Sequence, residues 1–177
     1  SHASGKLSTV TGGFSGRAEG DYSFVGGGFC NLASGLSSFV GGGYTNVASG
    51  VASVAGGGCE NTASGKFSFT GSGWCNNASG LSSFIGGGSA NIASGGGSVI
   101  VGGYCNMACV TCSSIIGGCG NTARHACTVL AGTDLVSVSA RMLYANSLFL
   151  VLSDVATTDP GVPGVIYHTN GTVKISC

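Results

Sequence analysis

The chain has 177 residues, of which only 7% are charged, and its formal net charge is zero. It therefore has no basic face that would bind nucleic acid, and it has no acidic tail. Low charge also disfavours a freely dispersed monomer and favours a surface that is covered by partners. Glycine contributes 35 residues, which would indicate disorder if they were scattered, but here they recur at a fixed spacing.

A unit of fifteen residues repeats without insertion over residues 1–135, and its clearest copy is Asn31–Thr45. Every copy has alanine at its third position and serine or threonine at its eighth. Asparagine stands at the first position of the later copies, whereas the two earliest copies have Ser1 and Gly16 there. These asparagines are Asn31, Asn46, Asn61, Asn76, Asn91, Asn106 and Asn121.

The repeat predicts an all-β fold. Fifteen residues are too few for a helix–turn–helix unit, and the glycine content disfavours helix. Two short strands joined by tight turns fit this length. We therefore expect a parallel β-solenoid, or β-roll, of nine coils that stack at about 4.8 Å into a rod roughly 40 Å long. Identical side chains would then lie above one another, so the asparagine column and the serine column are expected to hydrogen-bond along the axis.

Two adjacent apolar residues recur in most coils, as in Phe39-Val40 and Phe84-Ile85. Successive side chains of a strand point to opposite faces, so both cannot fill the same core. We expect one column to fill the coil interior and the other to be covered from outside. Phe39, Val40, Phe84 and Ile85 are thus the candidates for packing between chains. A lone solenoid would be marginally stable, so we expect several chains to pack side by side; the alternative is a monomer covered by its own tail.

The chain has nine cysteines, most of them in its later coils. Cys112 and Cys127 occupy the same column in consecutive coils, which places them within disulfide range. A bridge between them is expected if the rod is extracellular. The alternative treats the cysteines as small apolar residues that fill core positions. Zinc binding through Cys109 and Cys112 is a third option, although no second pair follows at zinc-finger spacing.

Residues 136–177 form the second part of the chain. Residues 136–139 alternate like a strand, and we expect an extended segment that crosses to a neighbouring subunit after Leu135. The apolar run 148–152 is too short to span a bilayer, so the sequence predicts no membrane insertion. Further on, Asn170-Gly171 separates two alternating stretches and predicts a C-terminal β-hairpin.

The residues that usually carry out catalysis do not converge in this sequence. The acidic residues are spread over distant coils and the tail: Glu19, Asp21, Glu60, Asp134, Asp154 and Asp159. The three histidines share no spacing, and the glycine runs do not open a helix as a phosphate-binding loop does. The sequence therefore predicts a protein that is not an enzyme, with no catalytic residues, no cofactor and no metal.

The pattern N-x-A-S-G-x-x-S-[FV]-[VI]-G-G-G resembles repeats in fibre proteins of bacteriophages and large viruses, and also the head repeats of trimeric autotransporter adhesins. Residues 158–176 are similar to a short C-terminal module of virion proteins. The resemblance implies a homotrimeric fibre, extracellular or on a virion surface, that contacts other fibre proteins and a host receptor or glycan.

The unit is longer than is typical of bacterial adhesin heads, which favours a virion or secreted fibre. A bacterial adhesin head remains an alternative. So does a ligand-binding solenoid such as an ice-binding protein, which the serine column motivates.

Overall fold

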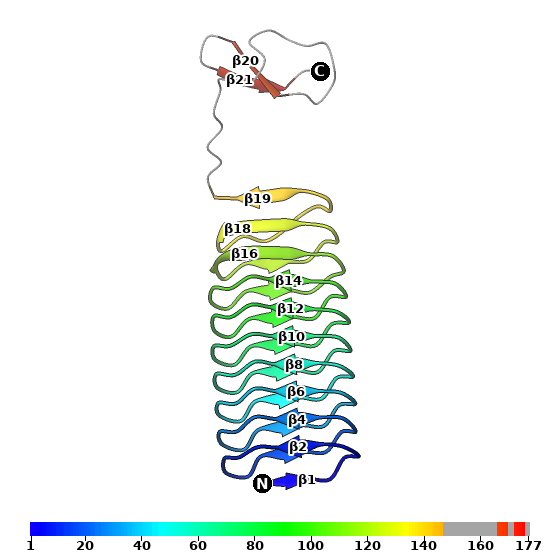
Figure 1. Ribbon diagram of the computed structural model, residues 1–177. Coiled ribbons are helices and arrows are strands. Elements are labelled where there is room, and N and C mark those ends of the chain that lie inside the picture. Colours follow the sequence, from blue (N-terminus) through cyan, green and yellow to red (C-terminus); the bar gives the residue numbers. More distant parts are fainter. Residues whose placement is uncertain (147–165, 170–171, 176–177) are drawn as a thin grey trace. The chain divides into compact units, whose positions relative to one another are not determined.

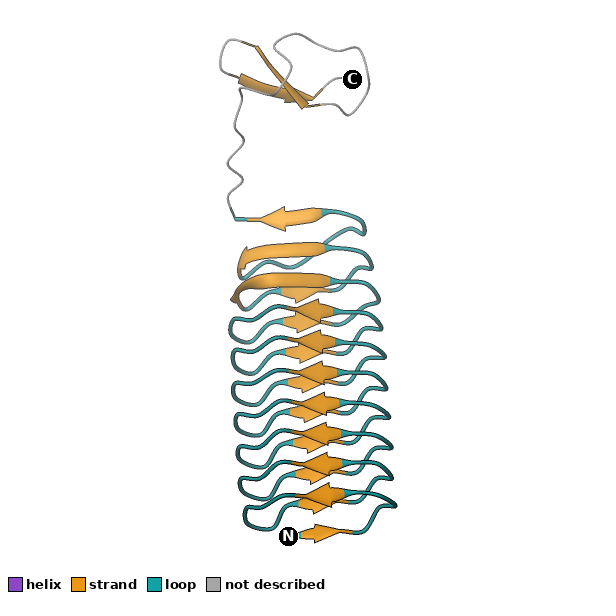
Figure 2. Cartoon of the chain, viewed as in Figure 1, coloured by secondary structure: helices purple, strands orange, loops and turns teal. Residues whose placement is uncertain are grey.

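The computed structural model describes residues 1–146, 166–169 and 172–175. Contacts divide the chain into two units, Ser1–Asn146 and Ser147–Cys177. The described residues form strands, turns and bends, without helix. This part of the chain accordingly holds no helix that is long and apolar enough to cross a membrane. The first unit is a parallel β-solenoid whose coils lie directly above one another (Figures 1 and 2).

Two parallel sheets run the length of the solenoid. The first consists of β1 (His2–Ala3), β3 (Arg17–Ala18), β5 (Leu32–Ala33), β7 (Val47–Ala48), β9 (Thr62–Ala63), β11 (Asn77–Ala78), β13 (Ile92–Ala93), β15 (Met107–Ala108) and β17 (Thr122–Ala123). The second consists of β2 (Thr9–Val10), β4 (Phe24–Val25), β6 (Phe39–Val40), β8 (Val54–Ala55), β10 (Phe69–Thr70), β12 (Phe84–Ile85), β14 (Val99–Ile100), β16 (Ser114–Cys119), β18 (Val129–Thr133) and β19 (Leu143–Ala145).

The predicted register is confirmed through most of the rod. In the first sheet Ala33 pairs with Ala48, and in the second Phe39 pairs with Val54, so partners are fifteen residues apart. Single bridges at the fourteenth position of each coil, such as Phe29 with Tyr44, form a third ladder. Because backbone N–H groups along these three ladders donate to carbonyl oxygens of adjacent coils, the coils are joined by hydrogen bonds on three sides.

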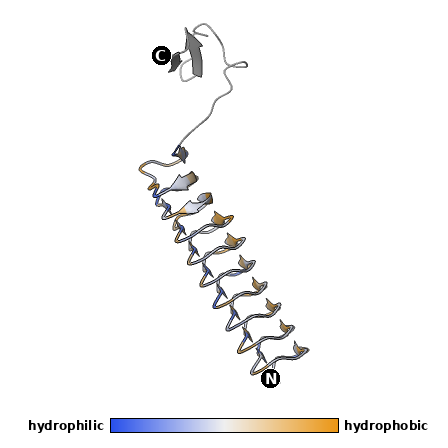
Figure 3. Cartoon of the chain, turned by 90° about the vertical axis from the view of Figure 1, so that its left-hand side faces the viewer, coloured by the Kyte–Doolittle hydropathy of each residue, from blue (hydrophilic) through white to orange (hydrophobic). Residues whose placement is uncertain are grey.

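The core is narrow and consists of small and branched side chains. Ala33 and Ala48 face inward from the first sheet, and Val40 and Ile85 face inward from the second, all with no exposed surface. The apolar strands recur at the same place in successive coils (Figure 3). Val40 and Ile85 are therefore wrong as candidates for packing between chains, because one chain buries them completely. Their neighbours Phe39 and Phe84 face outward and are 40% and 38% exposed.

In several coils three glycines follow the strand of the second sheet, and these glycines serve different purposes. In the triplet Gly41-Gly42-Gly43, the last has a left-handed backbone with φ of 89°, a conformation that glycine adopts at little cost. A Cβ at Gly41 or Gly43 would collide with the carbonyl oxygen of the glycine one coil further on, whereas a Cβ at Gly42 would have room. Ser72 stands at this middle position in a later coil, as that space allows.

The repeat predicts a rod that ends at Leu135, but the structure shows that the rod continues. Val136 bridges to Thr122, and β19 pairs in parallel with β18, so residues 136–146 form a further coil on the same chain. The expected crossing to a neighbouring subunit is thus wrong for this segment. A bulge at Ile116 changes the pairing. Beyond the bulge, paired residues are fourteen residues apart, as Cys119 and Thr133 are. Leu135 and Tyr144 pack against the last part of the core.

In the second unit, β20 (Ile166–Thr169) and β21 (Thr172–Ile175) form an antiparallel pair. Thr169 pairs with Thr172, which leaves Asn170 and Gly171 as a two-residue connection. The predicted hairpin is therefore confirmed. The apolar run 148–152 lies outside the described residues.

The apolar core is interrupted near its middle. It forms two clusters, one within residues 18–55 and the other within residues 78–130. Between them Thr70 occupies the position that holds valine or isoleucine in most other coils, and it is completely buried. Its hydroxyl makes one long hydrogen bond, donated to the carbonyl oxygen of Val54 at 3.5 Å. The hydroxyl therefore gains little in exchange for its lost hydration.

We predict that Thr70→Val stabilises the rod. Valine has nearly the same shape, removes the buried hydroxyl and extends the apolar core, so the free energy of unfolding should rise by about 0.5–2 kcal/mol. Denaturant unfolding would measure this change. The matched control is Thr62→Val, which makes the same substitution on the half-exposed outer face. A destabilised Thr70→Val variant would contradict the prediction.

Candidate functional site

The asparagine column forms a continuous buried ladder, as predicted. From Asn46 to Asn121 the backbone N–H of each asparagine donates to the side-chain oxygen of the asparagine one coil earlier; the distance is 2.8 Å for Asn46 to Asn31 and 3.1 Å for Asn121 to Asn106. Side-chain amides join the same oxygens, as between Asn76 and Asn61 at 3.0 Å. The members are at most 1% exposed. The ladder therefore links the coils through their interior.

The same side chains satisfy the glycine turns. The amide nitrogen of Asn46 donates to the carbonyl oxygen of Gly42 in the preceding coil and to that of Gly58 in its own coil, both at 2.9 Å. The pattern repeats up to Asn121, which donates to Gly117 and Gly132. Buried carbonyl groups need such donors. Each asparagine thus holds the glycine turn of the preceding coil and the glycine turn of its own coil.

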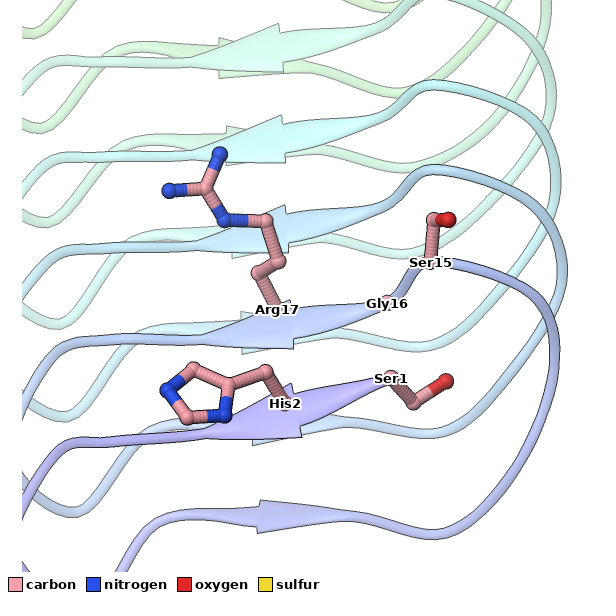
Figure 4. Close-up of a pocket in the computed structure, with 5 residues that line it drawn as sticks. All are labelled: Ser1, His2, Ser15, Gly16 and Arg17. Atoms are coloured by element: carbon pink, nitrogen blue, oxygen red, sulfur yellow. The ribbon is translucent and has the colours of Figure 1, made fainter.

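The ladder stops at both ends where asparagine is absent. At the far end, Leu135 takes the next position and donates its backbone N–H to Asn121 at 3.0 Å. At the near end, Ser1 and Gly16 stand in asparagine positions, and a pocket lies beside them, lined by Ser1, His2, Ser15, Gly16 and Arg17 (Figure 4). Arg17 also forms an ion pair with Glu19.

The serine column lies in the interior but does not form the axial ladder that we expected. Ser38, Ser53 and Ser83 are at most 1% exposed, and their hydroxyl oxygens have no hydrogen-bond partner among the described residues. Ser8 and Ser113 donate instead to carbonyl oxygens within their own turns, at 2.7 and 2.6 Å. The serine column is thus a structural feature of the turn.

Two outward columns of large side chains remain exposed. The first, which we call the phenylalanine ladder, consists of Phe24, Phe39, Val54, Phe69, Phe84 and Val99. Its rings stack in pairs, Phe24 on Phe39 at 5.2 Å and Phe69 on Phe84 at 5.1 Å between centroids. Each ring lies beside a glycine of its own coil, as Phe39 does beside Gly41.

The second, which we call the aromatic column, occupies the fourteenth position of each coil. Phe14, Phe29 and Tyr44 stack here at 5.1 Å. The fifteen-residue spacing of these three aromatic residues marks the column in the sequence.

The cysteines are scattered over several outward positions. Cys112 and Cys127 lie in the same turn of adjacent coils, both exposed and both as free thiols. Their disulfide stays a prediction that depends on redox conditions. Among the described residues, no three His, Cys, Asp or Glu side chains gather as they would around a metal ion.

One cysteine has a perturbed acidity. The Cys75 thiol donates to a carboxylate oxygen of Glu60 at 3.0 Å, one coil earlier. This hydrogen bond, together with partial desolvation and the nearby charge, raises the pKa of Cys75 to about 11. Because the thiolate is the nucleophilic form, Cys75 is a weaker nucleophile than a free cysteine near neutral pH.

Comparisons with protein-family models and with curated proteins gave no match to this chain. The parallel solenoid of fifteen-residue coils therefore rests on the structure alone. The likeness to fibre repeats is a resemblance of sequence pattern.

We predict that Asn76→Ala strongly destabilises the rod. The change leaves the carbonyl oxygen of Ser72 without its donor and the N–H of Asn91 without its acceptor, and it removes one of the two donors to the carbonyl oxygen of Gly88. Unpaired buried groups cost about 1–3 kcal/mol each, so the free energy of unfolding should fall by about 2–5 kcal/mol in denaturant unfolding.

The neighbouring Asn77 provides a matched control, because it faces outward and its side-chain oxygen has no partner. Asn77→Ala should change stability by less than about 1 kcal/mol. Equal effects of the two substitutions would show that the asparagine ladder does not stabilise the rod.

Proposed function

We propose that the chain is a non-enzymatic structural or adhesive component of a virion or extracellular fibre. The observation that carries this proposal is the uninterrupted stack of coils, in which the inner residues of every coil serve stacking. Such a rod gives reach, and its outward columns provide repeated contact surfaces. The resemblance to virus and phage fibre repeats supports the same function, as does the low charge of the chain.

The phenylalanine ladder supports self-association, with a homotrimer as the proposed state. Its rings lie on the outer face of the second sheet, from Phe24 in the second coil to Phe84 in the sixth, and Phe39 and Phe84 are exposed. Burial of apolar surface contributes about 25 cal/mol per Å², so a partner that covers this ladder would be favoured. Three parallel rods would bring three copies of it to a common axis. Other fibre proteins and a host receptor or glycan are the proposed further partners.

The ice-binding alternative rested on the serine column. That column is buried, with Ser53 and Ser98 completely inaccessible, so it cannot meet an ice surface. A bacterial adhesin head uses the same mechanical principle as a virion fibre and remains the second candidate.

We predict that Phe39→Ser combined with Phe84→Ser dissociates the oligomer while the rod stays folded, because both rings point away from the core. Sedimentation at micromolar concentration should show that the variant no longer forms the trimer that the wild-type chain forms. The control is Ile92→Ser combined with Met107→Ser, which removes apolar side chains from the outer face of the other sheet. A wild-type chain that sediments as a monomer would refute the trimer.

We also predict that deletion of Asn61–Cys75 shortens the rod by one coil and leaves it folded. The deletion removes one full period, so Glu60 is followed by Asn76 and every column stays in register. Stability in stacked repeats is approximately a sum over neighbouring interfaces. Electron microscopy should show the shorter rod, and circular dichroism its strand content.

The control deletion removes residues 61–67, which breaks the register and should abolish folding. Loss of folding in the full-period variant would contradict a rod that serves as a spacer. Turnover of a glycan or peptide by the purified protein would contradict the structural function itself.

A further inference from the structure

The aromatic column has a pattern that stacking within one chain does not require. From the third coil to the eighth, large and small residues alternate strictly: Tyr44, Cys59, Trp74, Ser89, Tyr104 and Cys119. Bridges between successive members place each one directly above the last. The column therefore presents aromatic side chains at every second coil, with a vacancy between them.

Each vacancy has about the height of one aromatic ring. Where rings occupy consecutive coils, as Phe29 and Tyr44 do, their centroids are 5.1 Å apart. Trp74 is two coils from Tyr44 and two from Tyr104, so an added ring would fit between them at ordinary stacking distance. The existing rings are far from covered, since Tyr44, Trp74 and Tyr104 are 50%, 55% and 57% exposed. Only a partner with matching periodicity would cover the rings and fill the vacancies together.

We propose that the partner is a second copy of this chain, paired antiparallel through the aromatic column. A two-fold axis between the fifth and sixth coils sets coil n against coil 11 − n. This arrangement places every aromatic residue of coils 2–7 opposite a small residue. The facing pairs are Phe29 with Thr133, Tyr44 with Cys119, Cys59 with Tyr104, and Trp74 with Ser89. Facing large and small residues interdigitate, and the paired rods overlap along their full length.

Other arrangements of two rods fit less well. Parallel rods in register would place Trp74 against Trp74 and Ser89 against Ser89. A parallel pair staggered by one coil would match coils 3–8 but would set Phe29 against Tyr44, and such a contact continues without closing. The antiparallel pair closes on itself with two identical halves.

Charge favours the same arrangement. At the position next to the aromatic column, Glu60 faces Cys105 of the second copy, whereas a parallel pair would set Glu60 against Glu60.

The experiment replaces Tyr44 with the photoreactive aromatic amino acid p-benzoylphenylalanine. Irradiation should link position 44 to the peptide that contains Cys119. These positions are five coils apart within one chain, about 24 Å, so that link forms only between two copies. A link from position 44 to position 44 would indicate a parallel pair and overturn the proposal, as would the absence of any link between chains.

A second measurement fills the central vacancy. Ser89→Trp should abolish the 44–119 link and weaken pairing at least about tenfold, because the new side chain occupies the space of the facing Trp74. The control Thr62→Trp adds the same side chain on the outer face of the first sheet and should keep the link. Circular dichroism verifies that both variants fold. A persistent link in the Ser89→Trp variant would overturn the proposal.

This pairing is independent of the trimer proposed above. The variant with Phe39→Ser and Phe84→Ser should keep the 44–119 link even though it no longer forms the trimer. Loss of the link in that variant would overturn the assignment to the aromatic column. If the column binds a soluble oligosaccharide and no link forms between chains, its partner is a glycan and not a second copy, and the proposal is overturned.

Discussion

The hydrogen bonds of the buried asparagine side chains are the constraint on which the rest of the rod depends. The glycine turns direct carbonyl groups into an interior without charged side chains, and each amide satisfies two of them while its oxygen accepts from the next coil. A slip of one residue would separate all these groups at once, at a cost of about 1–3 kcal/mol for each group left unpaired. The polar ladder therefore fixes the register, while the apolar core supplies most of the burial.

The end of the rod follows from the same constraint. After Asn121 the next inward position is Leu135, which keeps the backbone donor to Asn121 but has no amide to continue the ladder. The pairing also changes there from fifteen to fourteen residues, through the bulge at Ile116. The ladder thus ends in the coil where the period changes, and the apolar Leu135 and Tyr144 pack against the core beyond it.

The sequence predicted the coils, their register and the asparagine ladder, because fixed spacing in a stack translates directly into neighbours in space. It did not predict which of Phe39 and Val40 faces inward, since both are apolar and alternation alone gives no direction. The choice follows from the width of the core, where the facing alanine column leaves room for Val40 but not for a phenylalanine ring. The tenth coil was missed for another reason. Ile116 continues an ordinary apolar run, and nothing in the sequence marks it as a bulge.

Inward and outward positions of the coils vary in different ways, and the difference locates function. The inward alanine and asparagine columns hardly change, because every coil must fit the same narrow interior. The outward positions of the first sheet run from His2 and Arg17 to Ile92 and Met107 without pattern, as expected of a surface under little constraint. The phenylalanine ladder and the aromatic column lie between these extremes. They are exposed, so stacking does not dictate them, yet their sizes are ordered from coil to coil. Contact with further chains would impose such an order of side-chain sizes on positions that a single chain does not bury.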